Sequence, residues 1–410
     1  MKRTFLQWAL TVAVASLLSV GSIARAQDKP AQDKPSLTKK VASPVRSAQK
    51  ALEKEKWADC VTDLRKADAV EDKGPYDIFA INELLGFCAA RMDDLATAAT
   101  AYEAALDSGF LDPALINLRH KQLMQVNYNL KNYAKAAAFG KKAIELGERD
   151  ENTYTLAAQA FYLLEDFAST RDFVQGWIAY LESQNASPPE IGVQLYLSSC
   201  IKLQDDACAL QALEKQATYH PRAETWPNLI LLVFRQADES QTIDVLRLAF
   251  DRDGMRRAEE YTEMAQLALE RGLPGEAQSV LEAGVAKSMF TDARAKELSD
   301  RLLATATTQA KTDRVEVEKQ AAQSAAGKNG QVDVRIGQAF LSYGEPAKAI
   351  EAIERGLAKG NVRNVPDAHL ALGIAQLRSG NKAAAVEAFD AVKGNVTLEL
   401  LARLWKIAAR

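Results

Sequence analysis

The sequence is poor in the residues that build catalytic and metal sites. Its 410 residues include only three histidines, His120, His220 and His369, and these lie far apart along the chain. None of them is spaced from another histidine, a cysteine or a carboxylate as zinc ligands are. The His-Glu-x-x-His, Gly-x-Ser-x-Gly and Gly-x-Gly-x-x-Gly motifs are also absent. We therefore expect no catalytic residue, no metal ion and no cofactor.

Paired carboxylates are equally scarce. The pairs Asp93-Asp94 and Asp205-Asp206 are the nearest approach to an acid–base dyad. Both pairs lie where one expected helix ends and the next begins, and an aspartate in that position caps the following helix. We interpret them as helix caps.

The chain also lacks an excess of charge and a second long apolar run. It carries 51 Lys and Arg against 54 Asp and Glu, with a net charge of −3, and the basic residues are spread among acidic ones. A protein that binds nucleic acid has its basic residues clustered in a patch, and this sequence shows no such cluster. After the first 26 residues, no apolar run approaches the length that crosses a bilayer. We expect a mature protein that does not span a membrane.

The first 26 residues form the one long apolar run. Lys2 and Arg3 precede an apolar stretch from Phe5 to Val20, and the sequence Ala-Arg-Ala ends at Ala26. This is the pattern of a secretory signal peptide, with cleavage expected between Ala26 and Gln27. An uncleaved membrane anchor is the alternative, although polar residues interrupt the run. A lipoprotein anchor is excluded because the first cysteine, at position 60, is far from this site.

The two flanks of the remaining chain differ in composition. Residues 27–40, QDKPAQDKPSLTKK, are polar, contain proline and repeat internally, which indicates a disordered linker. Residues 396–410, VTLELLARLWKIAAR, predict a helix with a buried stripe of Leu400, Leu401, Leu404 and Ala408. Its other face, with Glu399, Arg403, Lys406 and Arg410, is expected to meet water.

What the chain has in place of catalytic motifs is a repeated pattern. Residues 261–284, YTEMAQLALERGLPGEAQSVLEAG, and 334–356, VRIGQAFLSYGEPAKAIEAIERG, share their layout. In both, apolar residues recur at steps of three and four, as in two amphipathic helices. Gly272 and Gly344 suit a helix end in the left-handed conformation, and the proline that follows is preset for a first helical turn. Each stretch therefore predicts an αα-hairpin.

The same frame fits most of the chain. The small central position of its first helix recurs at intervals of 33–39 residues, at Ala48, Gly86, Met124, Ala158, Leu197, Ile230, Ala265, Gly337 and Gly373. One interval, from Ala265 to Gly337, is 72 residues, twice the usual step. We expect an off-consensus unit there, near 291–329, and about ten hairpins between residues 41 and 395. An unrelated all-helical bundle is the alternative.

These spacings resemble the tetratricopeptide repeat (TPR), with its large residue, Leu-Gly and aromatic in the first helix and its alanines in the second. The resemblance implies an all-α protein, a right-handed α-solenoid of about ten TPR-like hairpins in which 396–410 is the capping helix. With its signal peptide, the chain is similar to secreted TPR proteins of Gram-negative bacteria. That similarity implies an exported, soluble periplasmic scaffold that binds a protein or peptide partner and catalyses nothing.

The resemblance also implies which residues face the partner. In TPR proteins the concave groove is lined by the first helix of each unit, one and four positions after its small residue. Glutamine recurs at the first of these positions, and an aromatic or large aliphatic residue fills most of the second. The expected partner-binding residues are Phe87, Gln125, Tyr128, Gln159, Tyr162, Phe234 and Gln266. An amide can grip a peptide backbone or a sugar hydroxyl, and a ring can stack beside it.

Other interpretations remain open. The glutamines can be exposed helix formers, and the rings can belong to the core between helices. At the level of the whole protein, an envelope-assembly or polysaccharide-export scaffold is the main alternative, and a glycan-binding protein or hydrolase is a further one.

Four cysteines in an exported chain suggest disulfides. In a solenoid, Cys60 and Cys88 lie on neighbouring helices, and Cys200 and Cys208 flank one turn. The other two connectivities would join units several hairpins apart, beyond the reach of a disulfide. We expect the bonds Cys60–Cys88 and Cys200–Cys208, with buried free thiols as the alternative.

Overall fold

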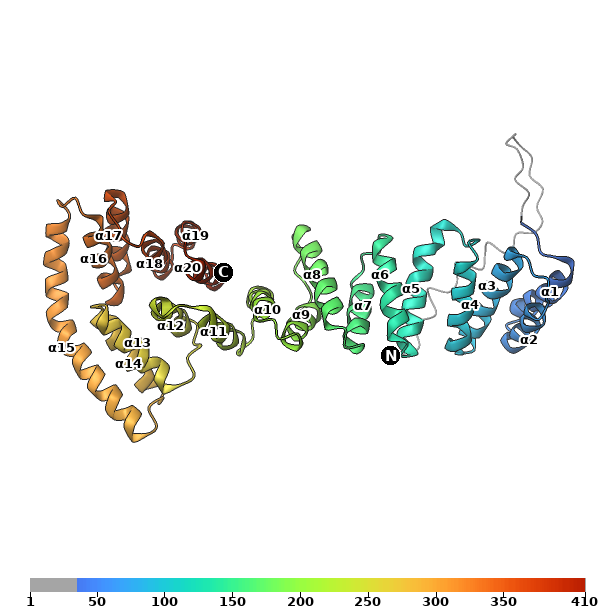
Figure 1. Cartoon of the computed structure of the whole chain (residues 1–410), viewed down its shortest axis with the longest axis horizontal. Helices are drawn as coiled ribbons and strands as arrows, with labels where there is room; N and C mark the ends of the chain where they lie inside the picture. Colours follow the sequence, from blue (N-terminus) through green and yellow to red (C-terminus); the bar gives the residue numbers. More distant parts are fainter. Residues whose placement is uncertain (1–34, 410) are drawn as a thin grey trace. The chain divides into compact units, whose positions relative to one another are not determined.

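The computed structural model describes residues 35–409, and every regular element in that range is a helix (Figure 1). The expected signal peptide, its cleavage site at Ala26 and Gln27, and most of the expected linker lie outside the described residues. The chain divides into two compact units, Met1–Leu203 and Gln204–Arg410. Each unit is described by itself below.

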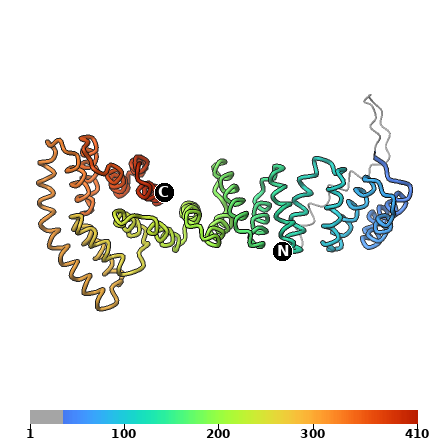
Figure 2. Tube along the Cα trace, viewed as in Figure 1, coloured from blue at the N-terminus to red at the C-terminus, as the bar shows by residue number. Residues whose placement is uncertain are grey.

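The N-terminal unit is a stack of helical hairpins whose trace can be followed in Figure 2. Consecutive helices pair as α1/α2, α3/α4, α5/α6 and α7/α8, and the first helices of successive hairpins also touch. The helices are α1 (Lys39–Glu53), α2 (Trp57–Asp68), α3 (Pro75–Arg91), α4 (Leu95–Asp107), α5 (Pro113–Asn129), α6 (Tyr133–Glu145), α7 (Glu151–Leu163), α8 (Phe167–Ser183) and α9 (Glu190–Lys202).

The C-terminal unit contains the hairpins α13/α14, α16/α17 and α18/α19, together with the consecutive helices α10 to α12, the long helix α15 and the last helix α20. Its elements are α10 (Asp206–Tyr219), α11 (Thr225–Gln236), the short 3-10 helix η1 (Glu239–Gln241), α12 (Thr242–Asp251), α13 (Ala258–Glu270), α14 (Pro274–Ala286), α15 (Ala293–Ser324), α16 (Gly330–Ser342), α17 (Pro346–Lys359), α18 (Val365–Arg378), α19 (Lys382–Asp390) and α20 (Val396–Ala408). The predicted all-α solenoid is confirmed.

The turns inside the hairpins are built as the sequence indicates. Gly272 and Gly344 have φ of 69° and 70°, so each supplies the left-handed residue after a first helix. A proline then stands in the first turn of α14 and of α17. The aspartates at other turns are helix caps, since Asp94 accepts a hydrogen bond from the Thr97 amide at 3.1 Å and Asp205 one from the Cys208 amide at 2.9 Å.

The small residues of the repeat mark the places where two helices meet most closely. At Gly337 a Cβ would lie 2.4 Å from Cγ1 of Ile353, and at Gly86 it would lie 2.5 Å from the Tyr102 ring. At Gly373 it would lie 2.3 Å from the Phe389 ring. Glycine is therefore needed because the second helix of each hairpin presses a side chain onto this position.

Residues 291–329, where an off-consensus hairpin was expected, contain no hairpin. They form α15, a single helix of 32 residues capped by Asp292. Most other hairpins turn at a residue with positive φ, but none occurs between Met289 and Tyr343. Helix α15 itself has neither glycine nor proline, since Gly327 comes after its end, and it is rich in Ala, Lys, Glu and Gln, which all favour a helix. It therefore has no glycine or proline that would end a first helix and allow a turn into a second.

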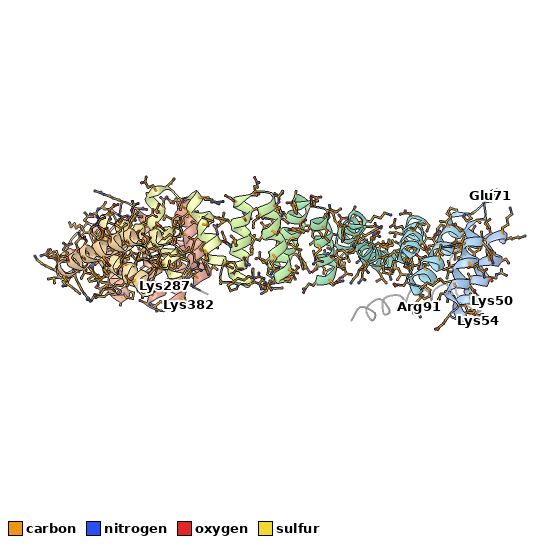
Figure 3. All side chains as sticks on the ribbon, turned by 90° about the horizontal axis from the view of Figure 1, so that it is seen from below. Lys50, Lys54, Glu71, Arg91, Lys287 and Lys382 are labelled. Atoms are coloured by element: carbon orange, nitrogen blue, oxygen red, sulfur yellow. A yellow bond between two sulfur atoms is a disulfide. The ribbon has the colours of Figure 1, made fainter. Side chains whose placement is uncertain are left out.

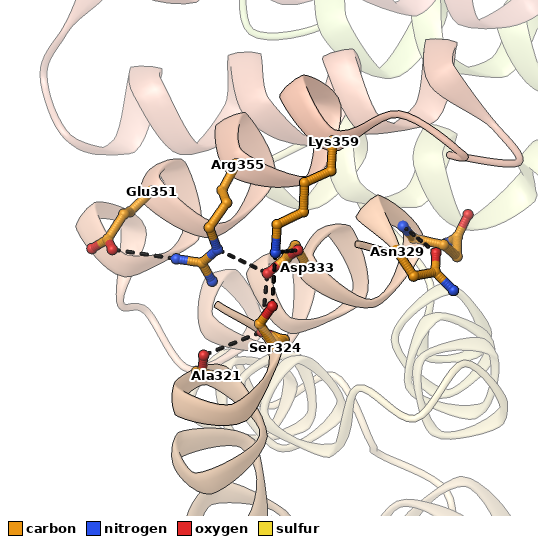
Figure 4. Close-up of polar contacts among 8 residues, drawn as sticks. Ala321, Ser324, Asn329, Asp333, Glu351, Arg355 and Lys359 are labelled. Atoms are coloured by element: carbon orange, nitrogen blue, oxygen red, sulfur yellow. Dashed lines mark hydrogen bonds and ion pairs between the residues drawn. The ribbon is translucent and has the colours of Figure 1, made fainter. Parts of the chain in front are cut away.

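A buried carboxylate anchors the end of α15 to the next hairpin (Figure 4). Asp333 in α16 accepts hydrogen bonds from Arg355 Nε at 2.9 Å, Lys359 Nζ at 2.6 Å and Ser324 Oγ at 2.9 Å. Burial alone would raise the pKa of Asp333, but these hydrogen bonds hold it below its usual value. The last turn of α15 is thereby tied to both α16 and α17.

Helix α20 does more than cap the last hairpin. Leu400, Leu401 and Leu404 are buried as expected, but the helix packs against α10 and α12 as well as α18 and α19. Arg403, expected to meet only water, donates two hydrogen bonds of 2.8 Å to the carboxylate of Glu214 in α10. The C-terminal unit is thus closed by a contact between its first and last helices.

All four cysteines are in disulfide bonds. Cys60 in α2 and Cys88 in α3 are bonded, with their Cα atoms 6.4 Å apart and both side chains buried. Cys200 and Cys208 are each disulfide-bonded as well, and no described cysteine is free.

Candidate functional site

The first helices α3, α5, α7 and α9 of the N-terminal unit carry most of the predicted partner-binding residues on one face. Phe87, Gln125, Tyr128, Gln159 and Tyr162 are all half-buried. Each of these side chains is therefore partly packed within the protein and partly open to solvent.

Hydrogen bonds join these positions from one repeat to the next. Tyr128 Oη in α5 donates to Gln159 Oε1 in α7 at 2.9 Å. The Tyr162 and Ser198 hydroxyls, from α7 and α9, lie 2.7 Å apart. In each pair, the residue four positions after the small residue meets the residue one position after it in the following repeat. We call the face that bears Gln125, Tyr128, Gln159, Tyr162 and Ser198 the inner row.

Aromatic contacts hold each ring of the inner row against its own hairpin. Tyr128 meets Tyr133 edge-on, with centroids 5.6 Å apart, and Tyr162 meets Phe167 at 5.3 Å. Burial raises the pKa of the Tyr128 hydroxyl, so it remains a hydrogen-bond donor through the neutral range. One edge of each ring is packed, and the rest of the half-buried ring is available to a partner.

Phe87 is held in a related way but joins a different cluster. Its ring meets Trp57 edge-on at 6.0 Å, and the Arg91 guanidinium stands 4.8 Å from the centroid of the same Trp57 ring. The side chain packs on the core around the Cys60–Cys88 disulfide. Tyr128 also packs on a core, that of Ala136, Ala137 and Ala160, so Phe87 and Tyr128 both contribute to packing.

Exposed apolar side chains extend the inner row at its α7–α9 end. Ile201 is 60% exposed and Leu163 is 48% exposed, and Leu164 and Leu203 are exposed nearby in the chain. Ile201 occupies the position in α9 that corresponds to Tyr162 in α7. Large apolar side chains at successive repeat positions are unusual on a surface that meets only water.

Buried polar contacts fix the spacing of the helices behind this row. Arg119 in α5 donates to both oxygens of Glu83 in α3, at 2.8 and 2.6 Å, and both side chains are buried. Arg119 also stands 4.0 Å from the Tyr102 ring centroid. Farther along, Lys121 in α5 donates to Asp150, the cap of α7, at 2.7 Å. These pairs hold α3, α5 and α7 in register.

The remaining two predicted residues lie in the other unit. Phe234 in α11 is half-buried and Gln266 in α13 is exposed. Neither makes a hydrogen bond or ring contact with another predicted site residue. The structure therefore brings together Tyr128 and Gln159 among the seven, with Gln125 and Tyr162 on the same helices.

Sequence analysis missed a buried charge network in the C-terminal unit. Arg247 in α12 donates to both oxygens of Glu276 in α14, at 2.8 and 2.7 Å, and to Asp244 at 2.7 Å. Burial raises the pKa of Asp244 to about 6, whereas Arg247 holds the pKa of Glu276 below its usual value against the effect of burial. Gln338 and Asp367, joined by a hydrogen bond of 2.8 Å, lie beside this network. Charged residues in the middle of apolar helices are the signal that points to it.

The histidines pack as ordinary side chains. His120 faces the Phe139 ring with centroids 5.8 Å apart, and burial lowers the pKa of both His120 and His369. Within residues 35–409, no three His, Cys, Asp or Glu side chains gather in a way that could hold a metal ion.

The outer surface of both units carries charges of both signs (Figure 3). Side chains that project there include Lys50, Lys54, Glu71 and Arg91 in the N-terminal unit and Lys287 and Lys382 in the C-terminal unit. Among the described helices, none is long and apolar enough to cross a membrane.

Stacked helical hairpins with a small residue at each close crossing define both units as α-solenoids. Residues 334–396, which cover α16 to α19, match the family model described as tetratricopeptide repeat. That stretch is therefore similar to tetratricopeptide repeats, and helical hairpins recur in the rest of the described chain. No functionally characterised protein matches its sequence significantly.

Several solved structures share the helical-repeat architecture at low sequence identity. A tetratricopeptide repeat protein from Parabacteroides merdae is 14% identical, with a TM-score of 0.29, over 66% of this chain and 100% of its own. The TPR2AB domain of yeast Sti1, in a complex with an Hsp90 peptide, is 14% identical, with a TM-score of 0.24, over 72% of this chain and 99% of its own. Naa15/Naa10 bound to HypK-THB is 14% identical, with a TM-score of 0.29, over 87% of this chain and 63% of its own. Superpositions this distant say nothing of a partner.

Proposed function

We propose that the protein is an exported, non-catalytic scaffold that binds an extended peptide, or a segment of a protein partner, along the inner row. A TPR fold is that of a protein-interaction scaffold, and the inner row is where this chain offers repeated contacts. The proposal rests on a tyrosine contact that recurs from one repeat to the next. Tyr128 contacts Gln159 in the following repeat, and Tyr162 contacts Ser198 in the repeat after that.

The chemistry of the row suits a peptide backbone. The Gln159 carbonyl oxygen already accepts from Tyr128, which leaves its amide nitrogen to donate to a partner's carbonyl. Gln125 lies one repeat earlier in the corresponding position and has both amide functions to offer. A strand that follows the repeats can therefore meet one amide and one ring at each step.

The apolar end of the row favours a partner with hydrophobic side chains. Ile201 is exposed three residues after Ser198 in α9, and Leu163 is exposed directly after Tyr162 in α7. Burying such side chains would contribute about 25 cal/mol for each Å² removed from water. A glycan would leave these apolar side chains without a matching surface, so we favour a peptide.

Export to a periplasm rests on two further features. The N-terminal sequence has the charged start, apolar run and small-residue end of a secretory signal. Disulfides of the kind seen at Cys60 and Cys88 persist in oxidising compartments.

The proposal is tested by replacing the rings of the inner row. In Tyr128→Ala/Tyr162→Ala, we expect capture of the partner from a periplasmic extract to weaken by about thirtyfold, because each of the two lost ring contacts costs about 1 kcal/mol. Both tyrosines make hydrogen bonds and ring contacts within the protein, so the melting temperature should also fall, and binding is compared on protein that circular dichroism shows to be folded. Leu146→Ala, which alters an exposed residue after α6, is the matched control and should bind as the parent does.

A different pattern would contradict the assignment. If the double variant loses most of its thermal stability while its folded fraction binds the partner normally, the rings belong to the core and the partner lies elsewhere.

A further inference from the structure

A large cavity lies in the C-terminal unit beside the long helix α15. Its volume is about 770 Å³, within the range of roughly 300–1,000 Å³ that is typical of sites for small ligands. The end of α13, the middle of α15 and the first turns of α16 form its walls, and Arg247, Gln338 and Asp367 line it as well.

The cavity is a consequence of the missing hairpin. An ordinary repeat places two packed helices between its neighbours, but here the single helix α15 passes across α13, α14 and α16. Val317 contributes a buried apolar contact, while Asp313 and Gln320 line the cavity from the same helix. One helix in place of two leaves this space unfilled by the protein.

Most charged groups in the cavity already have a hydrogen-bond partner within the protein. Arg247 is bonded to Glu276 and Asp244, Asp367 accepts from Gln338, and Asp313 accepts from the Tyr343 hydroxyl at 2.5 Å. These groups shape the cavity and need no ligand.

Two charges of opposite sign have no partner. Arg335 in α16 and Glu270 at the end of α13 both line the cavity, and both are exposed. Neither makes a hydrogen bond or an ion pair with any other residue in the range 35–409. Arg271 also lines the cavity, but its guanidinium donates to the Ser240 carbonyl oxygen. Arg335 and Glu270, which have no partner among residues 35–409, therefore offer one anion site and one cation site on different helices.

We propose that this cavity binds a short peptide with a free amino group and a free carboxylate. The guanidinium of Arg335 would take the carboxylate, for which its paired N–H groups are well matched. The carboxylate of Glu270 would take the ammonium group, and the amide of Gln320 is available to the peptide bond. A ligand with one charge of each sign neutralises both unpaired residues, whereas an anion or a cation alone neutralises one. The inference is independent of the partner proposed for the inner row.

Isothermal titration calorimetry with trialanine tests the proposal on the full mature chain. We expect binding of trialanine with free termini, and weaker binding, by about tenfold or more, after N-acetylation or C-terminal amidation, because each change removes a charged contact. Arg335→Gln should remove the preference for the free carboxylate alone. Glu270→Gln should remove the preference for the free amino group alone.

Arg294→Gln is the matched control, because Arg294 is an exposed arginine in the first turn of α15, outside the cavity. It should bind trialanine as the parent does. Both test residues are exposed, so circular dichroism should show all three variants folded. No heat with trialanine up to about 10 mM, where even weak sites are detected, would overturn the proposal. So would equal binding of the free, acetylated and amidated peptides, or a loss of binding in Arg294→Gln equal to that in Arg335→Gln.

Discussion

At the scale of the residue, the charge on Asp150 links two repeats of the N-terminal unit. It caps α7 through the Thr153 amide at 3.1 Å and accepts from Lys121 in α5 at 2.7 Å. Burial raises the pKa of Asp150, but the hydrogen bonds from Lys121 and Thr153 outweigh this and lower it from 3.8 to about 2. The stability that the carboxylate contributes is therefore present above pH 3.8 and is lost as the pH falls through about 2.

Asp150→Asn tests this dependence, because asparagine keeps the capping oxygen and removes the charge. We expect the variant to be less stable than the parent at pH 7. Urea unfolding at a series of pH values should show the difference closing between about pH 4 and pH 2. A difference that stays constant over that range would mean that the charge of Asp150 contributes nothing.

Glycine at the helix crossing makes a second prediction at this scale. In Gly337→Ala the added Cβ would lie 2.4 Å from Ile353 Cγ1 and 2.9 Å from the Ala349 carbonyl oxygen. We expect a loss of about 1–3 kcal/mol in the free energy of unfolding, because α16 and α17 must move apart. Gly176→Ala is the control, since nothing lies within 4 Å of its Cβ, and helix propensity should make that variant slightly more stable. Equal effects of the two substitutions in a denaturant titration would contradict the account.

At the scale of the element, the sequence predicts the structural features that depend on local residue patterns. The left-handed glycines, the aspartate caps and the small crossing residues all follow from the spacing of a few residue types, and each has the predicted position. The long helix α15 was not predicted, because the period of 36 residues favours a hairpin, whereas the absence of glycine and proline between Thr291 and Gly327 decides against one.

Contacts between residues far apart in the chain escaped prediction for a different reason. The pairing of Arg403 with Glu214 depends on how the repeats of the C-terminal unit curve, and no local pattern encodes that curvature. The same holds for Arg335 and Glu270, which line one cavity from different helices. In the inner row the sequence predicted which positions lie on one face, but not that Tyr128 would donate to Gln159.

Closure of the C-terminal unit by α20 is testable with one substitution. Trp405 is fully buried and its ring stacks on Phe389 with centroids 6.3 Å apart. Trp405→Ala should cost about 3–5 kcal/mol and should speed amide exchange in α12, which is distant in sequence but packs against α20. Val396→Ala, at an 86% exposed position of the same helix, should leave exchange unchanged. Faster exchange confined to α18 and α19 would show that α20 is only a terminal cap.

At the scale of the whole molecule, the two units differ in how they present their surfaces. The N-terminal unit repeats one contact along successive hairpins, which suits an extended partner. The C-terminal unit is closed by α20 and contains a cavity with two unpaired charges, which suits a small ligand. Each unit is built from stacked helical hairpins. The difference lies in the exposed apolar positions of the N-terminal unit and in the single helix α15 that replaces a hairpin in the C-terminal unit.

The central claim, that a partner lies along the inner row, is tested most directly by site-specific photo-crosslinking in cells that export the protein. A photoreactive residue is placed at Ile201, at the exposed end of the row, and in a second variant at Val285 in α14, which is similarly exposed but lies outside it. We predict one discrete crosslinked partner at Ile201 that disappears in the Tyr128→Ala/Tyr162→Ala background, and no adduct at Val285. A partner captured at Val285 and absent at Ile201 would contradict the claim.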